Sequence, residues 1–268
     1  MKFERKYKLD ENFFENIDTE EKAYILGFVY SDGNNKSQHS GLKFALNPQD
    51  LDILEKIKFA LKSDAKILFK TINGYDKIEI DFNSYKLSKD LTNKGAAPNK
   101  TYKIVFPLFL DKTLIRHFIR GYFDGDGCIW NGKRKKMYVK DSTCKSGFKN
   151  RIVHNVKFTI TSNTNFILGI QNYLVEELGF KRTKIYHRIK TNEAIGTLEY
   201  SGRGNIKKLY DYMYKDATIY GERKFKKFNE ILCALDEKSS SETELIAGNP
   251  LEPFKLQSNT LNGIGLNV

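Results

Sequence analysis

Two short stretches of the chain each place an aspartate directly before a glycine at the end of an apolar run. The first stretch is YILGFVYSDGNN at 24–35, and the second is FIRGYFDGDGCIW at 118–130. The aspartates concerned, Asp32 and Asp126, are 94 residues apart. Carboxylate oxygens are hard ligands that suit Mg²⁺, together with water and the phosphate oxygens of a substrate. If both aspartates reach one place, they predict a divalent-metal site beside a phosphate-bearing partner.

The chain repeats itself around these two aspartates. Residues 27–33 align with 121–127 at an offset of 94, and 41–54 align with 155–168 at an offset of 114. The second copy therefore has about 20 extra residues, and the segment 131–150 fits that gap. This segment has seven Lys or Arg against one Asp, and we expect it to form an extended basic hairpin.

Both copies have the same predicted order of elements. Asp18 followed by Glu21 predicts the start of the first apolar helix, and Pro107 with Asp111 predicts the start of its counterpart. Each copy is predicted to fold as αββαββα, which makes the fold class α+β with mostly antiparallel sheets. Predicted strands cover residues 42–47, 65–72, 77–82, 156–161, 183–190 and 196–202.

The repeat also divides the chain. We expect an N-terminal repeat at 1–105, a C-terminal repeat at 106–236, and a tail at 237–268. The tail, beginning EKSSSETELIAGNP, loses the apolar periodicity, so we predict that it is flexible or loosely docked.

Small residues lie on one face of each apolar helix. Gly27 and Ser31 are four residues apart, as are Gly121 and Gly125. Small side chains at this spacing let two helix backbones approach more closely than the usual ~8–10 Å. If the helices cross at these faces, Asp32 and Asp126 lie side by side, and a cation between them relieves their repulsion.

The charge balance indicates a polyanionic partner. Lys and Arg number 45 against 33 Asp and Glu, which gives a net charge of +12 and a pI near 9.3. Nucleic acid is the favoured partner, ahead of an anionic membrane surface. No apolar run reaches the ~18 residues of a membrane span, and the N-terminus lacks the apolar centre of a signal peptide. We therefore expect a soluble intracellular protein, in a bacterial or phage cytoplasm or an organelle matrix.

Few other side chains offer a catalytic set. The three cysteines show no metal-binding spacing, and neither do the four histidines. The sequence DGDG resembles a calcium loop, but the EF-hand needs Gly at its sixth position and Glu at its twelfth, where this chain has Ile129 and Lys135. Phosphohexomutases have a similar metal loop followed by Asp-Arg, whereas Cys128 and Ile129 follow here.

At these residues the chain resembles the LAGLIDADG homing endonucleases, in their single-chain form with two fused repeats. LGFVYSDG at 26–33 and RGYFDGDG at 120–127 align with the second to ninth letters of the motif. They have its small third position, its apolar middle and its final Asp-Gly. The first copy departs at the sixth position, where Tyr30 replaces an aspartate that the second copy keeps as Asp124. The resemblance covers about residues 15–235.

The resemblance implies roles for particular residues. Asp32 and Asp126 are expected to bind Mg²⁺ or Mn²⁺, with the carbonyls of Ser31 and Gly125 as further ligands. A basic residue near the end of each repeat is expected beside the scissile phosphates, and the best matches are Lys100 and Lys224, with Lys103, Arg223 or Lys227 as substitutes. The partner implied is double-stranded DNA, bound in the major groove by two four-stranded antiparallel sheets that form a saddle.

The resemblance also implies a target of about two duplex turns, which is asymmetric because the two repeats differ in sequence. We expect a monomer. Predicted DNA contacts on strands and loops are Lys36, Gln38, His39, Lys43, Lys70, Lys77, Lys157, Lys184 and Arg188. Predicted contacts on the basic segment and the strand after it are Lys133, Arg134, Lys136 and Arg151.

The predicted function is a homing endonuclease that hydrolyses phosphodiester bonds with a divalent metal held between the two motif aspartates. Two alternatives keep this fold: an RNA maturase that binds intron RNA and assists splicing, and a DNA-binding protein that does not cut. Intact Asp32 and Asp126 favour the nuclease. An intein-embedded endonuclease is disfavoured because the chain begins with its own Met and lacks flanking splicing blocks.

Overall fold

The computed structural model describes residues 6–36, 38, 40–138, 149–187 and 194–247. For residues 133–138, 149–154 and 236–247 it describes the backbone but not the side chains. The chain divides into a compact unit of residues 1–232 and a second unit of residues 233–268. Among the described helices, none is long and apolar enough to cross a membrane.

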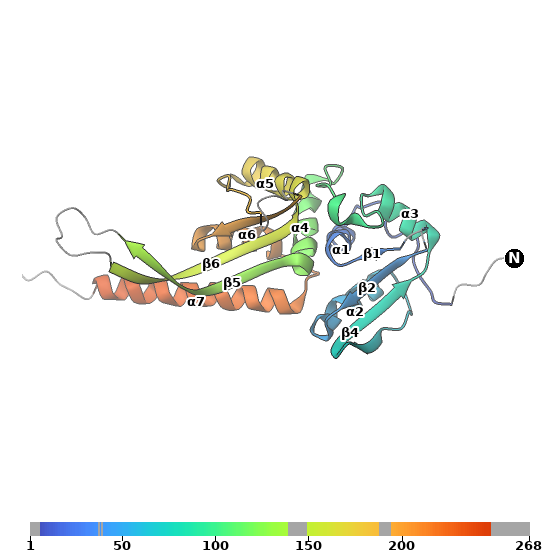
Figure 1. Ribbon diagram of the computed structural model, residues 1–268, viewed down its shortest axis with the longest axis horizontal. Helices are drawn as coiled ribbons and strands as arrows, with labels where there is room; N and C mark the ends of the chain where they lie inside the picture. The colour runs from blue at the N-terminus through green and yellow to red at the C-terminus, as the bar shows by residue number, and fades with distance from the viewer. Residues whose placement is uncertain (1–5, 37, 39, 139–148, 188–193, 248–268) are drawn as a thin grey trace, which may run out of the picture. The chain divides into compact units, whose positions relative to one another are not determined.

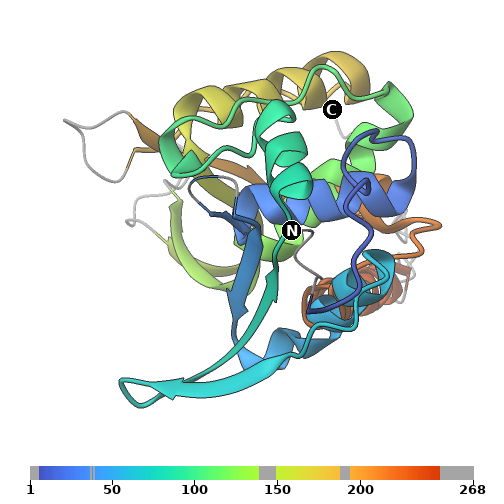
Figure 2. The same ribbon diagram turned by 90° about the vertical axis from the view of Figure 1, so that its right-hand side faces the viewer.

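The first repeat has the predicted αββαββα order. Its strands form one antiparallel sheet with the order β1-β2-β4-β3, in which Phe44 of β2 pairs with Ile80 of β4. The β3–β4 hairpin extends away from the helices (Figure 2), and every residue of β3 is exposed. The elements of this repeat are α1 (Glu20–Ser31), β1 (Asn34–Asn35), β2 (Leu42–Leu46), η2 (Pro48–Asp50), α2 (Leu51–Ala60), β3 (Leu68–Ile72), β4 (Tyr75–Phe82) and α3 (Tyr85–Asn93).

The second repeat follows a short 3₁₀ turn. Its three described strands form an antiparallel sheet with the order β5-β6-β7. β5 and β6 pair from Gly127↔Ile160 outward to Tyr138↔Lys149, which confirms the predicted long hairpin at this insertion. The 3₁₀ turn, η3 (Lys100–Tyr102), ends the first repeat. The elements of the second repeat are α4 (Lys112–Asp126), β5 (Gly127–Tyr138), β6 (Lys149–Asn163), α5 (Thr164–Leu178), β7 (Ile195–Ser201), α6 (Arg203–Tyr214) and α7 (Glu222–Ala247).

Three local predictions differ from the structure. The predicted strand at 183–190 is reduced, within its described part, to a single bridge between Tyr186 and Thr197. α7 continues to Ala247, so the first part of the segment expected to be flexible or loosely docked is helical rather than irregular. α1 begins after Thr19, whose hydroxyl caps the Lys22 N–H, whereas Asp18 forms an ion pair with the Lys22 ammonium.

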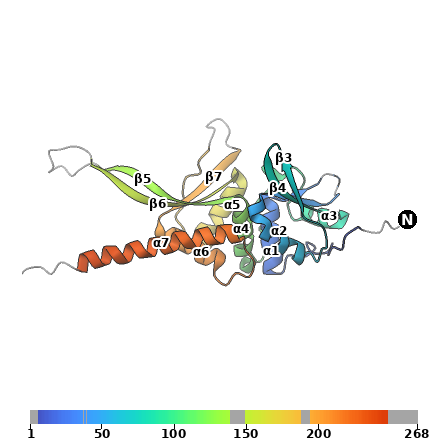
Figure 3. The ribbon, with the colours of Figure 1, turned by 90° about the horizontal axis from the view of Figure 1, so that it is seen from below.

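The two motif helices, α1 and α4, lie side by side in the core of the larger unit (Figure 1). All residues of α1 from Ala23 to Tyr30 are buried, as expected for a helix surrounded on every side. The ring of Phe123 on α4 stacks on Phe158 of β6 with centroids 4.7 Å apart. The strands of both sheets lie on one side of α1 and α4 (Figure 3). Each sheet therefore has an inner face on the core and an outer face where charged side chains lie beside exposed apolar and aromatic ones.

Candidate active site

The glycines of the motif bring the backbones of α1 and α4 into direct contact. A Cβ atom on Gly27 would lie 2.0 Å from the carbonyl oxygen of Phe118, and one on Gly121 would lie 1.9 Å from that of Tyr24. Each glycine thus faces the other helix at a point where no side chain fits. This contact confirms the predicted glycine interface and fixes how the two helices cross.

The same contact continues to the ends of the helices, where the acidic residues are. A Cβ atom on Gly125 would lie 1.8 Å from Ser31 Oγ and 2.5 Å from Asp32 Oδ2. The Asp32 carboxylate therefore touches the backbone of the residue that directly precedes Asp126. The structure brings together the two aspartates that lie 94 residues apart in the chain.

The surroundings of both carboxylates disfavour ionisation. Burial, followed by the charge of Asp126, raises the pKa of Asp32 from its usual range to about 6. Removal of water by the surrounding protein likewise raises the pKa of Asp126, against the opposing charges of Lys100 and Lys224. A divalent cation between these groups would offset both costs, since it favours the ionised form of each carboxylate.

One lysine from each repeat binds the carbonyl oxygens at the end of its own motif helix. Lys100 Nζ donates to the carbonyl of Ser31 at 2.9 Å and to that of Gly33 at 2.7 Å. Lys224 Nζ donates to the carbonyl of Phe123 at 2.7 Å and to that of Gly125 at 2.5 Å. The two predicted lysines therefore occupy matching positions beside the carboxylate pair.

Each site aspartate is stabilised in its ionised form most strongly by the lysine of the other repeat. Lys224 is the positive charge that most lowers the pKa of Asp32, whereas Lys100 has that effect on Asp126. Burial lowers the pKa of Lys224 to about 8 and shifts the pKa of Lys100 downward as well. Both ammonium groups are thus held with little water around them, where an electrostatic contact with a phosphate is strong.

The available donor atoms fit a hard divalent cation. The two carboxylates and the carbonyl oxygens of Ser31 and Gly125 are all oxygen ligands. Lysine ammonium groups already bind both of these carbonyls, so the oxygens point toward positive charge. Among the described residues, no group of three or more His, Cys, Asp and Glu forms a metal site. A site built from so few protein ligands leaves positions for water and phosphate oxygens.

Sequence reasoning assigned no role to two acidic residues near this site. The two carboxylate oxygens of Asp50 accept hydrogen bonds from the Arg223 guanidinium, at 2.7 and 3.0 Å. This contact holds Arg223 away from the phosphate-binding role that it was expected to take if Lys224 did not. Asp124 is buried behind the site, where Tyr24, Tyr214 and the backbone N–H of Gly221 donate to its carboxylate. The sequence positions of Asp50 and Asp124 do not indicate which residues these two aspartates bind.

The outer face of the first sheet is basic but partly neutralised. Lys43 and Lys70 both bind Glu79, at 3.0 and 2.5 Å. Lys36 similarly binds Asp81 at 3.0 Å. Lys77 is exposed and pairs in register with Lys70, so both side chains are on the same face of the hairpin.

The outer face of the second sheet is polar with one large aromatic ring. Lys157 pairs in register with Trp130 and binds Glu199 at 2.7 Å. Trp130 is 43% exposed on this face, which offers a flat surface for stacking. Lys184 lies in the exposed stretch before Tyr186.

Of the remaining predicted DNA contacts, Gln38 is exposed and has a left-handed backbone with φ 56°. Two predicted contacts lie outside the described residues, namely His39 and Arg188. The backbone of the basic hairpin is described, but four predicted side chains on it lie outside the described residues, namely Lys133, Arg134, Lys136 and Arg151.

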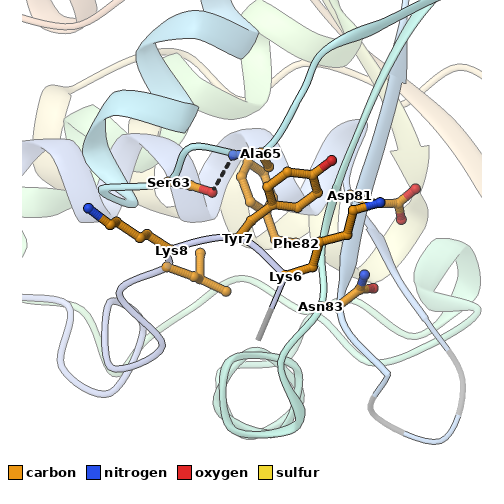
Figure 4. Close-up of a pocket in the computed structure, with 9 residues that line it drawn as sticks. Lys6, Tyr7, Lys8, Ser63, Ala65, Asp81, Phe82 and Asn83 are labelled. Carbon is orange, nitrogen blue, oxygen red and sulfur yellow. Dashed lines mark hydrogen bonds between the residues drawn. The ribbon is translucent and has the colours of Figure 1, made fainter. Parts of the chain in front are cut away.

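A small cavity elsewhere in the first repeat does not belong to this site. It has a volume of about 40 Å³ and lies between the N-terminal segment at Tyr7 and the end of β4 at Phe82 (Figure 4). This volume accommodates one or a few water molecules. Its lining includes neither motif aspartate and neither lysine of the site.

Known proteins with a similar fold were found by comparing structures. The chain superimposes on the LAGLIDADG meganuclease I-AabMI, bound to uncleaved DNA, with a TM-score of 0.52 and 17% identity, over 82% of this chain and 91% of that one. With I-LtrWI bound to target DNA the TM-score is 0.51 and the identity is 14%, over 85% of this chain and 92% of that one. With I-SmaMI bound to uncleavable DNA the TM-score is 0.51 and the identity is 15%, over 87% of this chain and 97% of that one. The chain therefore has the fold of the single-chain LAGLIDADG homing endonucleases, as predicted.

Sequence comparison finds partial matches to larger proteins. The chain is 34% identical over 128 residues to a DNA polymerase of Acanthamoeba polyphaga mimivirus, covering 43% of this chain. It is 25% identical over 234 residues to a reverse gyrase of Methanocaldococcus jannaschii, covering 84% of this chain. The matched segments span only 7% and 12% of the length of these relatives. No protein-family model matches the chain.

Proposed function

We propose that this protein is a site-specific endonuclease that cuts both strands of DNA by hydrolysing phosphodiester bonds. One observation supports the proposal above all others. Asp32 and Asp126 meet at the ends of two helices in backbone contact, and a lysine from each repeat lies beside them. The fold shared with DNA-bound homing endonucleases supports the same activity.

The proposed cofactor is Mg²⁺ or Mn²⁺, held by Asp32, Asp126 and the carbonyls of Ser31 and Gly125. The donor set is all oxygen, and the raised pKa of Asp32 indicates a pair of carboxylates that a cation stabilises. Such a cation supplies a water of lowered pKa and neutralises charge on the oxygens that attack and leave.

The protein groups have separate tasks in this proposal. The carboxylates of Asp32 and Asp126 hold the cofactor and limit where water stands relative to the phosphate. Lys100 and Lys224, as ammonium groups of low hydration, stabilise the negative charge that builds up on the phosphate oxygens. During hydrolysis, water adds to phosphorus and the bond to the leaving oxygen breaks.

The proposed partner is duplex DNA on the outer faces of the two sheets. Lys70 and Lys77 lie on an exposed hairpin where they can contact phosphates, and Trp130 offers a base-sized ring on the other sheet. The two repeats present different residues, which supports an asymmetric target of about two turns read by a single copy of the chain.

A cleavage assay tests the proposal directly. Purified protein is incubated with a library of long duplex DNA, with Mg²⁺ or with EDTA, and the ends produced are sequenced. We expect cuts at one sequence, only with the cation. Asp126→Asn should abolish cutting and leave binding to the selected site largely intact, because the change removes one charge and no bulk. Failure of the wild type to cut any target, or full activity of Asp126→Asn, contradicts the proposal.

A further inference from the structure

The sixth position of the two motifs has residues of different chemistry, although the motifs align elsewhere. Tyr30 in the first copy corresponds to Asp124 in the second. Both side chains are buried, and neither belongs to the proposed cation ligands. Their hydrogen-bond partners explain what they have in common.

Asp124 binds the start of the helix that contains one site lysine. Its Oδ2 accepts a hydrogen bond of 2.7 Å from the N–H of Gly221, the residue just before α7. Gly221 in turn begins the helix by accepting from the N–H of Phe225 at 3.0 Å. Lys224 lies in the first turn of this helix, and its ammonium reaches back to the carbonyls on either side of Asp124.

Tyr30 binds the end of the helix that precedes the other site lysine. Its hydroxyl donates to the carbonyl of Lys94, the C-cap residue of α3, at 2.5 Å. Gly95 lies against the same hydroxyl with φ +90°, where a Cβ atom would lie 2.2 Å from the Tyr30 oxygen. The chain then runs through Asn99, in a left-handed conformation, to Lys100 at the start of η3.

The chemistry of each residue matches the helix end that it binds. The last turn of a helix leaves carbonyl oxygens unpaired, so a donor such as the Tyr30 hydroxyl is suited to the end of α3. The first turn leaves N–H groups unpaired and is electropositive, so the carboxylate of Asp124 is suited to the start of α7. The difference between the two motifs follows from this difference in helix ends.

We propose that Tyr30 and Asp124 are positioning residues, each of which holds the segment that places its own repeat's lysine beside the carboxylate pair. Tyr30 acts on Lys100 through the end of α3, and Asp124 acts on Lys224 through the start of α7. This inference rests on the proposed nuclease function. It adds that each sixth position governs one lysine, and therefore the cleavage of one DNA strand.

Strand-specific cleavage tests the inference. Duplex DNA with the selected target is labelled on one strand or the other, and single-turnover cleavage is followed with enzyme in saturating excess, so that differences in DNA binding do not contribute. Lys100→Met and Lys224→Met first identify which strand depends on which lysine. Tyr30→Phe should then slow the Lys100-dependent strand about tenfold more than the other, and Asp124→Asn should do the same for the Lys224-dependent strand, as is typical for partners behind a catalytic group.

Tyr212→Phe is the matched control. It removes a partly buried hydroxyl that donates to the Tyr173 hydroxyl at 3.0 Å. We expect an unchanged ratio of strand rates. If Asp124→Asn does not fold, the milder Tyr30→Phe decides the question alone.

The outcomes separate the two proposals. Equal slowing of both strands by Tyr30→Phe, or no slowing at all, overturns the positioning role and leaves the nuclease function in place. A wild-type protein that cuts no target overturns both.

Discussion

At the scale of single residues, the carboxylate of Asp32 is placed for function at a cost to stability. Its pKa is raised to about 6 because burial and the charge of Asp126 outweigh the attraction of the two lysines. The pKa of Asp32 is therefore higher in the folded protein than in the unfolded chain, where it is near 3.8. Protonated Asp32 stabilises the fold at pH values below 3.8, and this stabilisation is lost as the pH rises to about 6. At neutral pH the metal-free protein therefore contains an unfavourable ionised group.

We predict that Asp32→Asn stabilises the metal-free protein at pH 7.5 by about 1–3 kcal/mol, because the amide removes the charge and keeps the shape. Urea unfolding in EDTA measures the free energy. The difference between variant and wild type should shrink as the pH falls from about 6 and approach zero only below 3.8, where Asp32 is protonated in the folded and the unfolded protein. A variant less stable than the wild type at pH 7.5 contradicts this account.

The lysine beside Asp32 gives a second prediction for a single residue. Lys224→Met should slow DNA cleavage by about 10²–10³-fold, the range found when one preorganised group that stabilises developing charge is removed. Binding should change little, because the lysine binds carbonyls inside the protein rather than a DNA groove. Filter binding and single-turnover cleavage measure the two effects. Lys227→Met, on the exposed side of the same helix, is the control and should cut normally.

The sequence identifies the acidic pair but not everything around it. Asp32 and Asp126 are found because they stand at equivalent positions of a repeat. Lys100 and Lys224 come from the family resemblance alone, since many other lysines occur nearby. The partners of Asp124 were not predictable, because Tyr24 and Tyr214 are distant in sequence and reach it only through the packing of α1 and α6 against α4.

At the scale of elements, the glycine contact between α1 and α4 determines whether the site forms. We predict that Gly27→Ala destabilises the protein by about 3 kcal/mol or more, because the added methyl would lie 2.0 Å from a backbone oxygen that cannot rotate away. Cleavage should fall as well, since the helices must separate at the carboxylates. Urea unfolding and the cleavage assay provide the two measurements.

Gly204→Ala is the matched control for that change. Gly204 lies in the first turn of α6, and a Cβ atom there would meet nothing within 4 Å. Alanine favours the helix more than glycine does, so this variant should be unchanged or more stable by up to about 1 kcal/mol. Equal destabilisation by both variants would contradict a specific contact at Gly27.

The predictability of an element depends on how much of its pattern is local. α4 and the strands on the core have clear apolar periodicity, α1 is apolar on all sides, and the structure confirms all of these elements. The stretch at 183–190 alternates in the same way, yet its described part pairs only at Tyr186. The segment after residue 236 lacks an apolar stripe, yet α7 continues through it to Ala247.

At the scale of the whole molecule, the net charge of +12 is an incomplete guide to where DNA binds. Glu79 binds two lysines of the first sheet, Asp81 binds a third, and Glu199 binds Lys157 of the second. These acidic partners hold the long basic side chains in place on the outer faces. In the proposed DNA complex, phosphates would compete with these carboxylates for the lysines, so affinity would depend most on the lysines that exchange a carboxylate for a phosphate.

The paired lysines of the β3–β4 hairpin provide the final prediction, which concerns the affinity of the whole protein for DNA. Each phosphate contact contributes about 0.9 to the slope of log affinity against log salt concentration. If Lys70 and Lys77 each contact a phosphate, the double change Lys70→Met with Lys77→Met should reduce that slope by about 2 and weaken binding at low salt. Fluorescence anisotropy with a labelled duplex, titrated at several salt concentrations, measures the slope.

Lys86→Met is the control, because Lys86 lies on α3 and binds Glu15 and Asp90. The slope measured for this variant should equal that of the wild type. An unchanged slope in the double variant would remove the hairpin from the DNA-binding surface and leave the second sheet and the basic β5–β6 hairpin as the surfaces to test.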